Sequence, residues 1–203
     1  KGLENLKKDN RISHWISVAF SVFERRKNMN YAVVGFGTAG YHAVKRSAPV
    51  TRREIDVYSN TSRAPYNPML TTYYAFGKLE FDGLFPFGDL DQIRKEISFH
   101  LIQEPVIRVH AKEHLVETKQ QTKQYDRILI ATGARAFAPP VKGLDPEDAF
   151  LMRTVEDSIR FKERLKQKNV RHAVVIGASM AGIKVVEVLH KYGIETWLLD
   201  LAK

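Results

Sequence analysis

The sequence predicts an α/β protein, because a glycine-rich turn between an apolar run and a helical pattern occurs twice in its 203 residues. The two turns span residues 35–40 and 177–182. Such a turn places backbone N–H groups at the positive end of a helix dipole, where a pyrophosphate binds. Each turn also belongs to a strand-helix-strand pattern typical of a layered nucleotide-binding fold. The sequence therefore predicts two dinucleotide sites, one near each end of the chain.

The first turn has glycine at each of the three positions where a side chain would interfere with the turn, the phosphates or helix packing. Gly35 permits the tight turn, Gly37 lets phosphates approach the backbone, and Gly40 lets the helix pack closely on its strand. A helix is predicted over 38–47 and a second strand over 54–58.

The residues after this second strand are unusual for a ribose site, because none of them is acidic. Ser59 and Asn60 stand there instead. A hydroxyl and an amide can both donate and accept hydrogen bonds, so these two residues are the candidates for holding a ribose.

The second turn keeps Gly177 and Gly182 but has Ser179 in the middle position. The small serine side chain crowds a phosphate only slightly and adds a hydroxyl donor. A helix is predicted over 183–192, ended by Gly193.

Asp200 follows the last predicted strand, over 195–199. A carboxylate at this place accepts hydrogen bonds from an adenosine ribose, and its charge repels the 2′-phosphate of NADP, so it favours NAD. A simpler role for Asp200, capping the strand end, stays open.

Between the turns lies an aromatic stretch, residues 64–78, in which two prolines precede a short helix. It suits either a wall beside a flat heteroaromatic ring or ordinary core packing. Beyond it we expect a helix to about His100, capped by Asp89 or Asp91, then a hairpin over 106–109 and 115–118. A buried strand over 128–131 then runs into the small-residue corner Thr132-Gly133.

Composition limits the chemistry. The apolar content of 44% suffices for a core, and the absence of cysteine excludes disulfides and thiol redox chemistry within these residues.

The formal charge is +9, and the basic residues are scattered along the chain without a nucleic-acid-binding motif. We therefore expect anionic dinucleotides rather than nucleic acid as partners. The histidines lack metal-ligand spacing. The apolar run 15–23 is too short to span a bilayer and no targeting signal is visible, so we expect no membrane contact and a cytoplasmic location.

The ordered set of motifs, a first glycine-rich turn, a strand ending in Ala131-Thr132-Gly133 and a second glycine-rich turn, resembles the FAD-dependent pyridine nucleotide-disulfide oxidoreductase superfamily. The likeness covers about residues 30–203 and points to NADH-dependent flavin reductases without an active-site cysteine. It implies a Rossmann-like three-layer fold that binds FAD and NAD(P). Within it we expect an N-terminal extension over 1–28, the first segment of an FAD-binding domain over 29–150, and a truncated start of an NAD(P)-binding domain over 151–203.

The resemblance also implies the cofactor contacts, residue by residue. For FAD these are Gly35, Gly37, Thr38, Ala39, Gly40, Ser59, Asn60, Val106, Ala131, Thr132, Gly133 and Arg135. In particular, Val106 would lie against the adenine through its backbone and Arg135 near phosphate. For the nicotinamide dinucleotide, with NADH favoured over NADPH, they are Gly177, Ser179, Met180, Gly182 and Asp200.

The activity implied is hydride transfer from NADH to FAD, followed by electron delivery to an unidentified acceptor, either a redox protein or a small molecule. The flavin supplies this chemistry, so no catalytic side chain is named. We expect the chain to be a fragment that binds FAD poorly and is inactive alone, and its full-length form to be a homodimer. The alternatives are a non-catalytic dinucleotide-binding protein, the product of a degenerate gene, and a nucleic-acid-binding module.

Overall fold

The computed structural model describes residues 28–51, 54–145, 148–167 and 169–201, and these form two compact units. Unit 1 comprises the described residues up to Ala64 together with Asp89–Gly133. Unit 2 comprises Pro65–Gly88 and the described part of Ala134–Lys203. The chain thus leaves unit 1 and returns to it, and the predicted domain boundary at residue 150 stays a prediction. All but one residue of the predicted extension over 1–28 lies outside the described residues.

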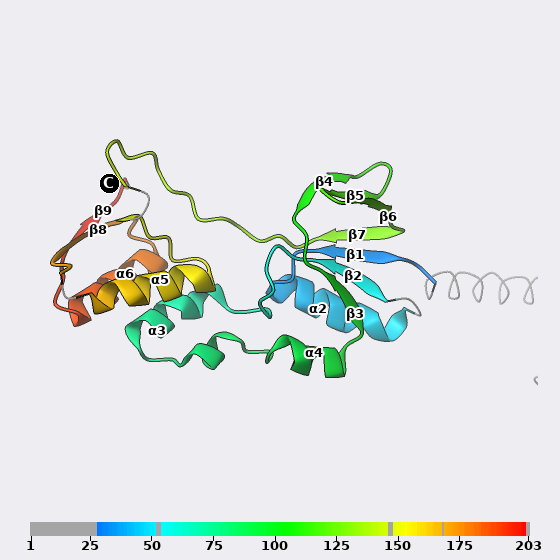
Figure 1. Cartoon of the computed structure of the whole chain (residues 1–203), viewed down its shortest axis with the longest axis horizontal. Coiled ribbons are helices and arrows are strands. Elements are labelled where there is room, and N and C mark those ends of the chain that lie inside the picture. Colours follow the sequence, from blue (N-terminus) through cyan, green and yellow to red (C-terminus); the bar gives the residue numbers. More distant parts are fainter. Residues whose placement is uncertain (1–27, 52–53, 146–147, 168, 202–203) are drawn as a thin grey trace, which may run out of the picture. The chain divides into compact units, whose positions relative to one another are not determined.

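Unit 1 is built on a parallel sheet, shown in Figure 1, with strand order β3-β2-β1-β7. The four strands are β1 (Tyr31–Val34), β2 (Ile55–Tyr58), β3 (Phe99–Ile102) and β7 (Arg127–Ile130). All are short, and β1 and β2 are largely buried, as expected of strands covered on both faces. The prediction of a buried strand over 128–131 is wrong: β7 is an edge strand of this sheet, and Leu129 and Ile130 are 44% and 61% exposed. Helix α2 (Thr38–Ser47) packs against the sheet and buries Tyr41 and Val44. A short 3-10 turn, η2 (Ala48–Val50), follows it.

The other face of this sheet is covered by an antiparallel sheet of three strands, β4 (Val106–His110), β5 (Leu115–Thr118) and β6 (Thr122–Gln124). A shared apolar core includes Ala32, Val34 and Val116. The predicted hairpin is confirmed, and β6 extends it by a strand. One prediction is wrong: the helix expected to reach His100 is α4 (Leu90–Glu96), capped by Asp89, and His100 lies in β3.

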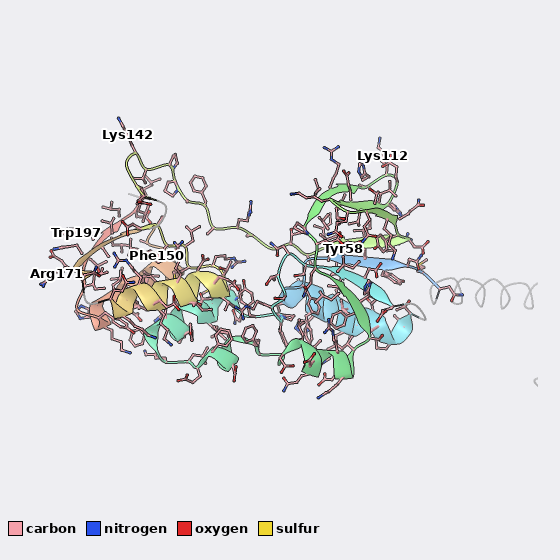
Figure 2. All side chains as sticks on the ribbon, viewed as in Figure 1. Tyr58, Lys112, Lys142, Phe150, Arg171 and Trp197 are labelled. Atoms are coloured by element: carbon pink, nitrogen blue, oxygen red, sulfur yellow. The ribbon has the colours of Figure 1, made fainter. Side chains whose placement is uncertain are left out.

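A polar network joins these two sheets inside unit 1. Asp56 Oδ2 accepts hydrogen bonds from Lys123 Nζ at 2.6 Å and from the hydroxyl of Tyr125 at 2.7 Å, while its Oδ1 lies 3.0 Å from His100 Nδ1. Because Tyr125 donates to Asp56, Tyr58 donates to Tyr125, at 2.6 Å. Burial raises the pKa of Tyr125, and the bonds to Tyr58 and Asp56 raise it further, so this phenol stays protonated. Figure 2 shows Tyr58 among the strands of unit 1.

Unit 2 packs three helices and a two-stranded parallel sheet. The helices are α3 (Thr71–Phe76), α5 (Val155–Lys166) and α6 (Met180–Lys191), and the strands are β8 (His172–Ile176) and β9 (Glu195–Leu199). Two 3-10 turns, η3 (Pro68–Leu70) and η4 (Phe81–Leu84), flank α3. The core gathers Ala75 from α3, Phe161 from α5 and Val188 from α6. Phe150 packs beside this core, and Trp197 lies on β9 (Figure 2).

In the described ranges, no helix is both long enough and apolar enough to cross a membrane.

Candidate nucleotide-binding turns

The first glycine-rich turn connects β1 to α2 at the carboxyl end of the parallel sheet. Gly35 has φ +103°, a backbone conformation that residues other than glycine rarely adopt. Its N–H donates to the carbonyl of Tyr58 at 2.8 Å. Gly37 is the N-cap of α2 and has no side chain with which to cap it. Gly37, Thr38 and Ala39 are all exposed, so the amides at this helix start face an open surface.

The second turn repeats this geometry in unit 2. Gly177 also has φ +103°, and its N–H donates to the carbonyl of Leu199 at 2.7 Å, as Gly35 does to Tyr58. Ser179 is the N-cap of α6, and its hydroxyl accepts a long hydrogen bond of 3.4 Å from the Gly182 N–H. Met180 begins the helix with 70% of its surface exposed. Two segments with different side chains therefore adopt one backbone conformation.

The glycines of the two turns differ in the space available for an added Cβ atom. Open space at a glycine shows where a phosphate could approach the backbone. A Cβ on Gly40 would collide with the carbonyl oxygen of Gly35, and a Cβ on Gly182 would collide with that of Gly177. These two glycines serve packing. A Cβ on Gly37 would instead meet nothing within 4 Å. The space in front of Gly37 is thus an open cradle lined by backbone amides, which fits a pyrophosphate.

Asp200 and Ser59 each directly follow the second strand of their unit, but their side chains make different hydrogen bonds. Asp200 directly follows Leu199, and its Oδ2 accepts a hydrogen bond of 2.5 Å from the N–H of Ala178. Ser59 directly follows Tyr58, yet its hydroxyl donates to the Thr61 carbonyl at 2.9 Å. Asp200 is exposed beside its turn, whereas Ser59 is only 6% exposed. Asn60, the other predicted ribose contact, is exposed.

The end of β7, which carries the Ala-Thr-Gly motif, lies against the first turn. The N–H of Ala131 donates to the carbonyl of Val34 at 2.7 Å, and a Cβ on Gly35 would collide with the carbonyl of Ala131. Thr132 and Gly133 follow on the exposed edge, with Gly133 at φ +69°. This edge therefore brings two chain segments, about a hundred positions apart, to one backbone surface.

Two further residues predicted to contact FAD, Val106 and Arg135, lie outside the first turn. Val106 begins β4 and pairs with Thr118 of β5 within unit 1. Arg135 is exposed and belongs to unit 2, so its expected contact with a phosphate at the first turn stays a prediction.

The aromatic stretch over 64–78 combines packing with exposure. Ala75 is fully buried in the core of unit 2, while Tyr73 is 40% exposed. Tyr73 and Phe76 line a groove between α3 and α6, together with Lys184. Lys184 pairs with Glu187 on the same helix at 2.9 Å. The packing role is thus present in the structure, and the flat-ligand role stays a prediction.

Several oxidoreductases match this chain over most of its length. The chain is 27% identical over 176 residues to the large subunit of nitrite reductase (NADH) of Escherichia coli, covering 84% of this chain and 20% of that protein. It is 24% identical over 181 residues to an NADH oxidase of Methanocaldococcus jannaschii, covering 86% and 40%. A solved covalent complex of putidaredoxin reductase with putidaredoxin matches with a TM-score of 0.74 and 23% identity, covering 86% and 43%.

The chain spans less than half the length of these relatives. A family model described as pyridine nucleotide-disulphide oxidoreductase matches residues 29–203, which contain both turns and the Ala-Thr-Gly strand. FAD and a nicotinamide dinucleotide, the two cofactors expected from the turns, are the cofactors of this family. The chain belongs to the pyridine nucleotide-disulphide oxidoreductase family.

Proposed function

We propose that this chain supplies the FAD-binding unit and the first part of the nicotinamide-binding unit of an NAD(P)H oxidoreductase. The observation that carries the proposal is the repeated turn geometry, with Gly35 and Gly177 at the same φ and each bonded to the end of the adjacent strand. Two such turns, each at the start of a helix, suit two pyrophosphates. The printed names of the relatives, an NADH-dependent nitrite reductase and an NADH oxidase, support the same activity.

Bound FAD would supply the redox chemistry, namely acceptance of a hydride from the nicotinamide and onward transfer of electrons. The residues of this chain bind the two dinucleotides and orient them. The exposed amides at the start of α2 hold one pyrophosphate, and those at the start of α6 hold the other. Asp200 accepts from the ribose of the second dinucleotide, and its negative charge favours NADH over NADPH. With no cysteine in the sequence, these residues offer no thiol to relay electrons.

The final acceptor is proposed to be a redox protein or a small molecule. The putidaredoxin complex supports a protein acceptor, because a reductase with this fold forms a covalent complex with its redox partner. A homodimeric full-length form and a cytoplasmic location remain part of the proposal.

The direct test is the absorbance spectrum of the full-length protein that carries this sequence, recorded before and after anaerobic addition of NADH. We expect a bound-flavin spectrum near 450 nm that bleaches with NADH, roughly one flavin per chain. A colourless protein that cannot be loaded with FAD but still binds NADH would establish a non-catalytic dinucleotide-binding protein instead.

A further inference from the structure

The two turns match in backbone geometry but not in the carboxylate that follows the second strand. Asp200 provides one in unit 2, beside the turn. In unit 1 the equivalent residue is Ser59, whose hydroxyl donates to the Thr61 carbonyl and accepts from the Thr61 N–H at 3.2 Å. Because that hydroxyl is already used twice and is 6% exposed, Ser59 is poorly placed to bind a ribose.

An acidic side chain does stand at the same edge, one strand further along. β3 is the parallel neighbour of β2, with Tyr58 paired to Ile102, and the N–H of Ser59 donates to the carbonyl of Ile102 at 3.0 Å. Glu104 follows two residues later. Adjacent strands are about 4.8 Å apart, so β3 ends one strand spacing from the end of β2, and Glu104 lies two residues beyond the end of β3.

A hydrogen bond from Thr118, at the end of β5, holds the carboxylate of Glu104 in place. Its Oε2 accepts a hydrogen bond of 2.6 Å from the hydroxyl of Thr118, a residue that is 5% exposed. That hydroxyl accepts from the N–H groups of Gln120 and Gln121, at 3.2 and 3.1 Å. Its proton has two acceptors within reach, the carboxylate of Glu104 at 2.6 Å and the carbonyl of Gln121 at 3.2 Å, and the shorter bond to a charged oxygen is the stronger one. The bond uses one oxygen of Glu104, and Oε1 remains able to accept from a ligand.

We propose that Glu104 replaces the missing strand-end acid of unit 1 and accepts hydrogen bonds from the ribose hydroxyls of the adenosine bound there. Thr118 acts as its positioning residue. Val106, predicted to contact the adenine, pairs with Thr118 in the sheet, so the adenine and ribose contacts would share one support. This inference rests on the proposed binding of FAD at the first turn.

The test compares two ligands that differ only at the ribose, ADP and 2′,3′-dideoxy-ADP, by calorimetry on the full-length protein from which bound FAD has been removed, with NADH absent. NAD analogues saturating the second site keep that site out of the measurement. Wild type should prefer ADP by about 10-fold or more, because hydrogen bonds to a charged group are strong. E104Q should lose most of this preference. The matched control E113Q changes an acid in the turn between β4 and β5, at the far end of those strands, and should keep it.

Each result has one meaning. A folded E104Q protein with an undiminished preference, or a wild type with none, overturns the role of Glu104. A wild type that binds neither ADP nor FAD at this site contradicts the proposed function instead. If E104Q fails to fold, T118V replaces it, since loss of the positioning hydroxyl should reduce the preference for ADP while leaving the charge of Glu104 intact.

Discussion

The carboxylate of Asp200 accepts a hydrogen bond of 2.5 Å from the backbone N–H of Ala178, 22 positions earlier in the chain. The bond ties the end of β9 to the middle of the second glycine-rich turn. One oxygen thus fixes the conformation of the turn, and on our proposal the carboxylate also accepts from the adenosine ribose of the dinucleotide. Asp200 would then couple the shape of the turn to the choice between NADH and NADPH.

The first prediction concerns this choice. D200A should weaken NADH binding about 10-fold or more, because a charged acceptor for the ribose hydroxyls is lost. NADPH should lose less affinity, since removal of the carboxylate also removes its repulsion of the 2′-phosphate. Fluorescence titration with both dinucleotides measures the ratio. E195Q, which neutralises an exposed acid at the opposite end of β9, is the control and should leave the ratio unchanged. An unchanged ratio in D200A would assign Asp200 a purely structural role.

The second prediction separates two glycines of the first turn. G37A should fold with nearly wild-type stability, because nothing lies within 4 Å of the added methyl group, yet it should bind FAD much more weakly. G40A should lower the melting temperature, because its methyl group collides with the carbonyl of Gly35 and forces α2 away from the turn. Thermal unfolding and FAD titration on the same samples distinguish the two effects. Equal melting temperatures for both variants would contradict this division.

Much of this architecture is predictable from local sequence. The turns, the helix over 38–47 and the strand over 195–199 are confirmed, because glycine spacing and apolar periodicity determine them locally. The helix predicted to reach His100 is too long. Ile97 continues the helical spacing from Ile93, but its backbone is extended, with φ −135° and ψ 126°. The pairing of β3 with β2 overrides the local preference there.

Other features depend on partners far apart in the sequence. Asp56 lies inside an apolar strand, and its partners Lys123 and Tyr125 come 67 and 69 positions later, so no spacing predicts their network. Glu104 is likewise recognisable only when the sheet order places β3 beside β2. Helix α5, in contrast, was open to prediction. Thr154 and Asp157 are a capping pair three residues apart, and they precede apolar residues at helical spacing.

The third prediction concerns the buried carboxylate of Asp56, whose side chain is 9% exposed. Replacing it with asparagine should reduce the free energy of unfolding at pH 7 by about 3 kcal/mol, because Lys123 and the Tyr125 hydroxyl lose a charged acceptor. Chemical denaturation followed by circular dichroism measures this loss. D91N, at a carboxylate that is 86% exposed, is the control and should change stability by at most about 0.5 kcal/mol.

The same carboxylate predicts a pH dependence. Burial opposes its ionisation, but the hydrogen bonds from Lys123, Tyr125 and His100 outweigh burial, so the pKa of Asp56 lies below its ordinary value of 3.8. A lowered pKa stabilises the folded protein above about pH 4, and this stabilisation disappears as the pH falls through the folded-state value. The stability gap between wild type and D56N should therefore narrow from pH 6 to pH 3. A constant gap over this range would show that the carboxylate charge is not what stabilises the network.

The last prediction concerns the start of α5. The hydroxyl of Thr154 accepts from the N–H of Asp157 at 3.0 Å, and the Asp157 carboxylate accepts from the N–H of Thr154 at 2.8 Å. T154A removes half of this reciprocal cap and should cost about 1 kcal/mol. Because α5 carries Phe161 and Leu165 into the core of unit 2, faster amide hydrogen exchange should spread from the first turn into that core. T154S retains the hydroxyl and should exchange like wild type. If T154A also exchanges like wild type, packing alone holds the start of the helix.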